Sequence, residues 1–108
     1  MPIDFDNFRE RKEELRECFA ILPKPFFVRL SGGRKGLHII LAEGQDDMQY
    51  RLKYDDPERL KIDAIRRKYG FTSNMLLSKK CIGHEVKIAG AWKIIKDDKD
   101  AKKFLEEL

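Results

Sequence analysis

The alternation of apolar and polar positions predicts a β-hairpin in the first half of the chain. Apolar residues recur with a period of two over residues 26–30 and again over residues 37–41, as in half-buried strands. Residues 31–36 between them contain three glycines and two cations. A glycine-containing link between two such runs is typical of a hairpin with a wide loop.

A helical period appears on both sides of this hairpin. Apolar residues at 8, 15, 18, 19 and 22 fall on one stripe, which predicts a helix over residues 8–22 that ends before Pro23. A second helix is predicted over residues 57–69, with Asp56 as its N-cap. A third begins at Asp97 or Asp98. Residues 44–54 are polar and irregular, and we expect a surface loop there.

Short apolar runs predict the remaining strands, over residues 1–5, 74–79, 84–88 and 91–95. The first six elements then follow the order βαββαβ. This order indicates an α+β fold with an RRM-like or ferredoxin-like core, followed by a C-terminal hairpin, joined at Gly90, and a helix. Two helices would cover one face of an antiparallel sheet and leave the other face open for a site. The length of 108 residues predicts one domain over residues 1–108.

Composition limits the environment and the classes of partner. Charged residues make up 39% of the chain and the net charge is +4, which permits a polyanionic partner without requiring one. The abundance of Lys, Glu and Arg is typical of heat-adapted proteins. Cys18 and Cys81 lack the spacing of a metal site, so neither zinc nor a disulfide framework is expected. With no long apolar run, we expect a cytoplasmic protein without a membrane partner.

The first candidate for chemistry is the pair Asp4 and Asp6. In an extended chain these carboxylates lie on one side, where they repel each other unless a cation such as Mg²⁺ or Mn²⁺ lies between them. Asp63 lies within the second predicted helix and is a candidate third ligand. The alternatives are that Asp4 is solvated, that Asp6 caps a helix, and that Asp63 pairs with a neighbouring arginine.

The second candidate is an anion site in the hairpin loop. Its backbone N–H groups and cations can hold a phosphate, and a histidine one residue inside the second strand can donate to it; the alternative is a solvated turn. The residues are Ser31, Gly32, Gly33, Arg34, Lys35 and His38. Further cations either follow a nucleic-acid backbone or are solvated, namely Arg59, Arg66, Arg67, Lys79 and Lys80. Trp92 with Phe71 or Tyr69 either stacks a base or packs in the core.

The two candidate sites together resemble the archaeo-eukaryotic primase superfamily. Ile3-Asp4-Phe5-Asp6 matches the family's metal-binding motif, and the run from Ser31 to His38 matches the motif that binds the triphosphate of the incoming nucleotide. Ile62-Asp63 is similar to the third motif, although Asp63 is predicted on a helix rather than a strand, and Asp55 or Asp56 is an alternative third acid. The chain is much shorter than the usual members.

The resemblance implies a minimal or truncated primase or primase-polymerase core. Such a protein is a template-dependent nucleotidyltransferase that uses two divalent metals to add nucleotides from NTP or dNTP. Its partners would be a nucleic-acid template and primer, and a larger replication subunit. The alternatives are a non-catalytic nucleic-acid-binding RRM-like module and a subunit that docks an acidic protein. Metal-dependent nucleotide binding distinguishes the enzyme from both.

Overall fold

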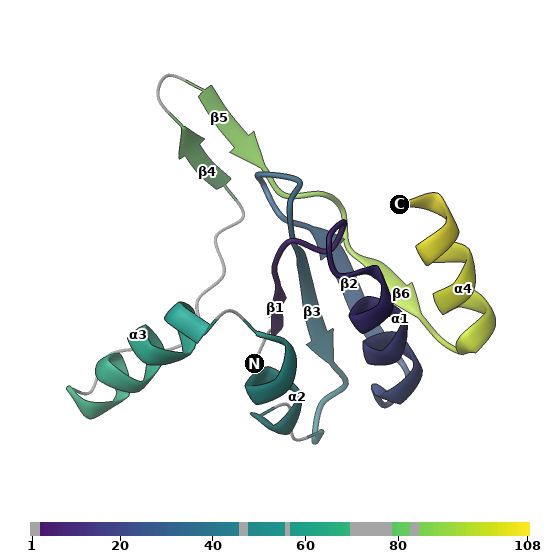
Figure 1. Cartoon of the computed structure of the whole chain (residues 1–108), viewed down its shortest axis with the longest axis horizontal. Helices are drawn as coiled ribbons and strands as arrows, with labels where there is room; N and C mark the ends of the chain where they lie inside the picture. The colour runs from purple at the N-terminus through teal and green to yellow at the C-terminus, as the bar shows by residue number, and fades with distance from the viewer. Residues whose placement is uncertain (1–2, 46–47, 56, 70–78, 83–84) are drawn as a thin grey trace.

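The computed structural model describes residues 3–45, 48–55, 57–69, 79–82 and 85–108. Figure 1 shows the helices and strands of this part of the chain. Their order is β1 (Ile3–Phe5), α1 (Lys12–Ile21), β2 (Phe26–Leu30), β3 (Leu37–Leu41), α2 (Met48–Tyr54), α3 (Pro57–Lys68), β4 (Lys79–Ile82), β5 (Glu85–Ile88), β6 (Lys93–Ile95) and α4 (Asp98–Glu107).

Four strands form an antiparallel sheet in the order β1-β3-β2-β6. Ile39 of β3 lies opposite Ile3 of β1 on one side and Val28 of β2 on the other. α1 connects β1 to β2, and β3 lies between them. A ferredoxin-like arrangement of the whole chain is not confirmed, because two helices follow β3 and the fourth strand of the sheet is β6. The predicted strand over residues 74–79 lies outside the described residues except for Lys79. The α+β class and the antiparallel sheet are confirmed.

The predicted C-terminal hairpin is wrong, although both of its strands form. β5 pairs with β4 in a separate two-stranded sheet, whereas β6 pairs with β2. The connection between them approaches the edge of β2 closely, since the Gly90 N–H donates to the carbonyl of Leu30 at 2.9 Å. The edge of β2 offers unpaired backbone groups that a strand can bond, and β6 takes that position.

The core lies between one face of the sheet and helices α1, α2 and α4. Residues at alternate strand positions point into it, and Leu15, Cys18 and Phe19 of α1 meet them. The Phe19 ring contacts Phe26 of β2 at 5.1 Å and Phe104 of α4 at 5.8 Å. These aromatic contacts hold α1 and α4 over the same face of the sheet.

The predicted loop over residues 44–54 is wrong, because its second half is helix α2 (Met48–Tyr54). The Tyr54 ring packs on Phe5 of β1 at 5.9 Å. The other inward position of α2 is Arg51, which pairs with Asp55 at 2.8 Å with both side chains fully buried. A charged residue at an inward position hides the helical period, and for this reason the pattern did not indicate a helix.

The predicted helices at residues 8–22, 57–69 and 97 onward all form, with adjusted ends. α1 begins at Lys12, since Asn7 has a left-handed φ of 52° and the following residues make a turn. Asp97 caps α4 by accepting from the Asp100 N–H at 2.9 Å. α3 projects away from the four-stranded sheet (Figure 1) and exposes Ile62 and Ile65. None of the described helices is both long enough and apolar enough to cross a membrane.

Candidate functional site

Three polar residues form a row across the sheet, on the face opposite the core. His38 of β3 lies opposite Asp4 of β1 and also opposite Arg29 of β2. Residues directly opposite each other on neighbouring strands share a face, so all three side chains are on the same side. His38 is only 5% exposed, although it lies outside the apolar core. The structure therefore brings the first predicted acid next to the predicted histidine.

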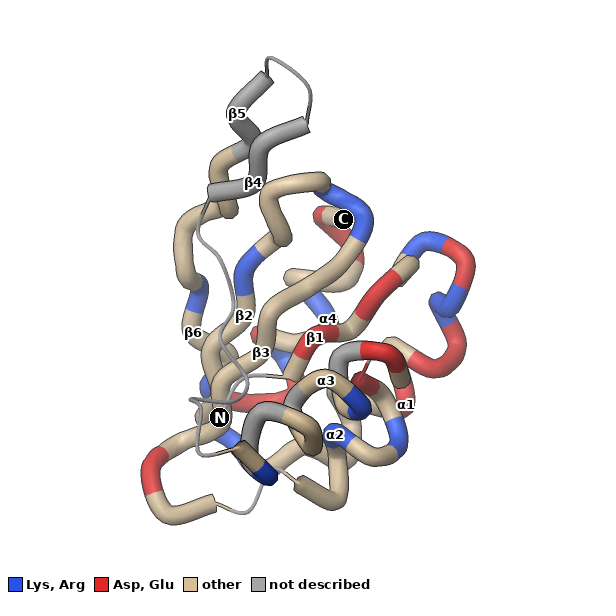
Figure 2. Tube along the Cα trace, turned by 90° about the vertical axis from the view of Figure 1, so that its left-hand side faces the viewer, with Lys and Arg blue, Asp and Glu red and all other residues tan. Residues whose placement is uncertain are grey.

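The loop between β2 and β3 is closed by its own hydrogen bonds. The Ser31 N–H donates to the Gly36 carbonyl at 2.9 Å, and the Gly36 N–H donates to Ser31 Oγ at 3.2 Å. The Arg34 N–H donates to the Ser31 carbonyl at 3.0 Å. Lys and Arg lie at this turn (Figure 2). Because these three N–H groups are used inside the loop, they are not donors to a bound anion, and the loop carries its positive charge on the Arg34 and Lys35 side chains.

Gly36 lies against the end of β1, where a side chain would crowd the Phe5 carbonyl. A Cβ at this position would be 3.0 Å from the Phe5 carbonyl oxygen, 3.5 Å from Asp4 Oδ1 and 3.5 Å from the Asp6 Cα. The Phe8 N–H also donates to the Lys35 carbonyl at 3.2 Å. The loop therefore packs on the segment that carries both predicted acids.

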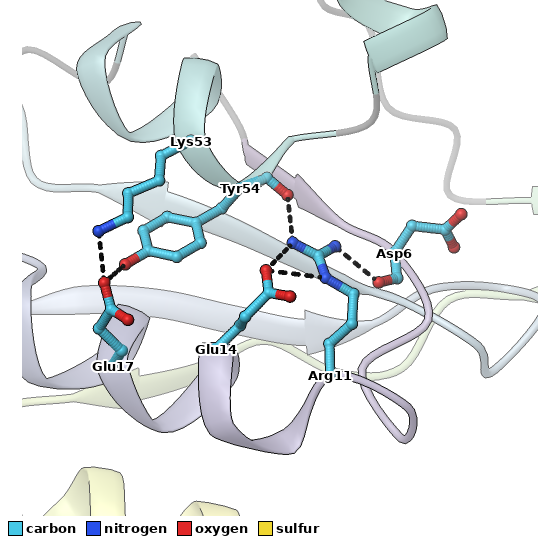
Figure 3. Close-up of polar contacts among 6 residues, drawn as sticks. All are labelled: Asp6, Arg11, Glu14, Glu17, Lys53 and Tyr54. Carbon is cyan, nitrogen blue, oxygen red and sulfur yellow. Dashed lines mark hydrogen bonds and ion pairs between the residues drawn. The ribbon is translucent and has the colours of Figure 1, made fainter.

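Arg11 fixes the backbone at Asp6 (Figure 3). Its Nη1 donates to the Asp6 carbonyl at 3.0 Å, and its Nη2 donates to Glu14 Oε2 at 2.8 Å and to the Tyr54 carbonyl at 3.5 Å. Its guanidinium also lies 4.1 Å from the centre of the Phe5 ring. In Figure 3 the Asp6 carboxylate points away from Arg11, which leaves that carboxylate for another partner.

The tyrosine beside this arginine belongs to a second contact that joins α1 to α2. Glu17 accepts from the Tyr54 hydroxyl at 3.1 Å and from Lys53 Nζ. The hydrogen bond from Lys53, the hydrogen bond from Tyr54 and the charge of Lys53 together lower the pKa of Glu17 from its usual value. Figure 3 shows both contacts between the same two helices.

Arg29 holds the predicted histidine from the other side. Its Nε donates to His38 Nδ1 at 3.0 Å, and its guanidinium lies 4.4 Å from the centre of the Trp92 ring. Burial lowers the pKa of Arg29 from its usual value, yet the side chain stays protonated at neutral pH. Sequence reasoning missed this residue. The alternation along β2 could have indicated it, because Arg29 lies on the same face of the hairpin as His38.

The donors at the end of β1 fit a hard divalent cation by their chemistry. Carboxylate oxygens are the ligands that Mg²⁺ and Mn²⁺ prefer. The Asp4 carboxylate and the Asp6 backbone lie next to Gly36. Among the described residues, no group of three or more histidine, cysteine or acidic side chains is arranged to hold a metal. Asp55, which follows α2, uses its carboxylate for Arg51.

The other predicted site residues lie elsewhere or outside the described part of the chain. Asp63 is on α3, as the pattern predicted, and this helix is not part of the sheet. Trp92 is 39% exposed and Tyr69 is 67% exposed, so neither is a core residue. Phe71 lies outside the described residues. The same holds for the side chains of Arg59, Asp63, Arg66, Arg67, Lys79 and Lys80.

Two cavities flank the α4 helix. One, of about 370 Å³, lies at the edge formed by β2 and β6 and is lined by Arg29, Arg34 and Lys93 among others. A Cβ at Gly90 would be 3.1 Å from Arg34 Nη1, so the Arg34 side chain reaches from the loop to this edge. The other cavity, of about 890 Å³, lies between α1 and α4.

Comparison of the chain with protein-family models, with curated proteins and with solved structures finds no match.

Proposed function

We propose that this chain is the catalytic core of a primase-type nucleotidyltransferase, which adds nucleotides from NTP or dNTP to a template-paired strand. One observation carries the proposal. The metal-binding and phosphate-binding motifs named from the sequence come together in space, because Asp4 lies opposite His38 and beside Gly36. Residues more than thirty positions apart share one end of the sheet, on the face away from the core.

In this proposal, the acids at the end of β1 hold the divalent ion. Asp4 and Asp6 bind Mg²⁺ or Mn²⁺. The resemblance assigns the third acid to Asp63, but its helix α3 projects away from the sheet (Figure 1), so the proposal rests on the first two acids. The chemistry that such an ion supplies is neutralisation of phosphate charge and activation of the attacking hydroxyl. Arg11 keeps Asp6 at the corner between β1 and α1 through the Asp6 carbonyl.

The hairpin positions the triphosphate. Arg34 and Lys35 supply two cations, and His38 donates from Nε2, because its Nδ1 accepts from Arg29. Ser31 closes the loop, and Gly32 and Gly33 complete it. The template backbone follows the cations of the second half of the chain, namely Arg59, Arg66, Arg67, Lys79 and Lys80.

The fold that accompanies this function is RRM-like. The position of β3 between β1 and β2, with α1 as the crossover, supports an RRM-like N-terminal half. In this proposal β6 extends the sheet at the β2 edge, and a larger replication subunit supplies the parts that longer enzymes of this class carry on one chain.

The test is Mn²⁺-dependent binding of a non-hydrolysable nucleoside triphosphate, followed by primer extension. We expect the double variant Asp4→Asn, Asp6→Asn to lose nucleotide binding and to reduce extension by at least about 100-fold, with an unchanged circular dichroism spectrum. The control is Glu10→Gln, Glu43→Gln, which makes the same charge change at two exposed residues. Equal nucleotide binding by the double variant and the control would contradict the proposal.

The alternatives give different results in the same assay. A non-catalytic nucleic-acid-binding module holds single strands in the presence of a chelator and shows no metal-dependent nucleotide binding. A subunit that docks an acidic protein binds neither nucleotide nor nucleic acid.

A further inference from the structure

We infer that the sheet face beside His38 is a base-stacking surface for single-stranded nucleic acid. The inference rests on the proposed function only for the class of polymer. Its first observation is an apolar row across three strands, in which Phe27 of β2 lies opposite Ile40 of β3 and Ile94 of β6. Phe27 is 40% exposed and Ile94 is 42% exposed. These large apolar side chains lie on the side of the sheet opposite the core.

The second observation is the stacked pair next to this row. Trp92 precedes β6 and stacks on the Arg29 guanidinium. The Arg29 Cζ atom is 4.4 Å from the centre of the Trp92 ring. Arg29 is in turn held by His38 at 3.0 Å. The indole is 39% exposed and is fixed by a cation on one side. Phe27 and Arg29 lie two residues apart along β2, which is about 7 Å. The apolar row and the Trp92–Arg29 pair can therefore each contact a different base.

The chemistry of this face fits single strands better than other partners. Flat aromatic side chains stack on bases of any sequence, and arginine adds a cation–π contribution. In a duplex these base faces are already stacked and are not accessible. Arg34 and Lys35 lie at the loop that ends β2, and the chain carries a net charge of +4, which suits a phosphate backbone.

The experiment uses Trp92 as its own reporter, because it is the single tryptophan of the chain. A short oligothymidylate is added in the presence of a chelator, and binding is followed by tryptophan fluorescence and by anisotropy of a dye on the oligonucleotide. We expect quenching that saturates together with the anisotropy. Trp92→Leu and Phe27→Leu should each weaken binding about 5- to 100-fold.

Tyr69→Leu is the matched control. Tyr69 is an exposed aromatic residue with Lys68 6.0 Å from its ring, but it lies at the end of α3, away from the sheet. We expect it to bind the oligonucleotide as the unmodified chain does. A duplex of the same length should bind more weakly than the single strand.

Several results would overturn the inference. One is an anisotropy change that saturates while the tryptophan fluorescence stays unchanged. Another is equal affinity of Trp92→Leu, Phe27→Leu and Tyr69→Leu for the oligonucleotide. A third is quenching that depends on protein concentration alone, which would mean that a second copy of the chain covers this face. Should Phe27→Leu fail to fold, the quenching in the unmodified chain still decides. The binding assay contains a chelator and therefore does not depend on metal or on nucleotide addition. The base-stacking surface and the nucleotidyltransferase activity can thus fail separately.

Discussion

Arg29 Nε donates a hydrogen bond of 3.0 Å to His38 Nδ1 across the β2–β3 ladder. A guanidinium has no acceptor and remains protonated, so Nδ1 carries the lone pair and the neutral imidazole has its proton on Nε2. In many catalytic sites a carboxylate or carbonyl accepts from Nδ1 and leaves Nε2 as a base. Here the arrangement is reversed, and His38 is suited to donate from Nε2, as contact with a phosphate oxygen requires.

This relationship predicts the behaviour of an Arg29→Leu variant. Loss of the donor should let His38 exchange between its two tautomers, and nucleotide affinity should fall about 10-fold, which corresponds to one net hydrogen bond of about 1.4 kcal/mol. Long-range proton–nitrogen spectra of the imidazole report the tautomer, and calorimetry reports the affinity. Arg16→Leu on the exposed side of α1 is the control. An unchanged His38 spectrum in Arg29→Leu would contradict the assignment.

The contact between Gly36 and β1 makes a second prediction. In Gly36→Ala the new methyl group would be 3.0 Å from the Phe5 carbonyl oxygen, so the backbone must shift at the cost of about 1–3 kcal/mol in the free energy of unfolding. The shift moves the loop away from Asp4 and should weaken Mn²⁺-dependent nucleotide binding. Thermal unfolding and calorimetry measure the two effects.

Gly90→Ala is the matched control for this variant. Its methyl group would approach the end of the flexible Arg34 side chain at 3.1 Å, which can move aside. We expect little loss of stability. A larger loss in Gly90→Ala than in Gly36→Ala would show that the contact with β1 is unimportant.

Arg11 provides a third prediction. It joins β1, α1 and α2 through hydrogen bonds to Asp6, Glu14 and Tyr54. Arg11→Met should therefore lower the free energy of unfolding by about 1–3 kcal/mol, as measured by urea denaturation. Arg16→Met is the comparison, since Arg16 makes an exposed pair with Glu13; its effect should stay within about 0.5 kcal/mol. Equal midpoints for the two variants would rule out the proposed role of Arg11.

The contact of Glu17 with Lys53 and Tyr54 predicts a dependence on pH. Because the contact lowers the pKa of Glu17 below its usual 4.5 in the folded protein, it stabilises the fold above that pH and is lost as the pH falls through the folded value. Glu17→Gln should therefore be less stable than the unmodified chain at neutral pH. The difference should shrink during acid titration below pH 4.5. A difference that stays constant across this range would show that the carboxylate is not involved.

The sequence predicted those helices and strands whose period of apolar residues matches the face that they bury. The hairpin at residues 26–41 formed with the expected strands because its period of two matches one buried and one open face. The expectation that the loop lies beside Asp4 and Asp6 came from the family resemblance. The alternation of apolar and polar residues does not predict it. The two arginines beside this site differ in how far they were predictable. Arg11 looks like an ordinary surface cation until the structure places it at the Asp6 carbonyl, whereas the alternation along β2 could have placed Arg29 on the face of His38.

The misplaced C-terminal strands have a different cause. The alternation in residues 84–95 correctly indicates two strands, but it contains no information on which edge each one joins. Adjacent strands usually pair with each other, and this general tendency predicted a hairpin. The hydrogen bond from Gly90 to Leu30 instead directs β6 to β2, and only the tertiary structure shows this choice.

The buried pair of Arg51 and Asp55 has a consequence for how α2 is mounted on β1. Both side chains are fully buried and joined at 2.8 Å within one helical turn. Because the partners lie four residues apart, the pair turns with the seven-residue helix and does not itself join α2 to β1. It neutralises the charges at the inward face of α2, where removing either partner would leave an unpaired buried ion at a cost of several kcal/mol. The helix can therefore keep a charged inward face while Tyr54 packs on Phe5 and presents its carbonyl to Arg11.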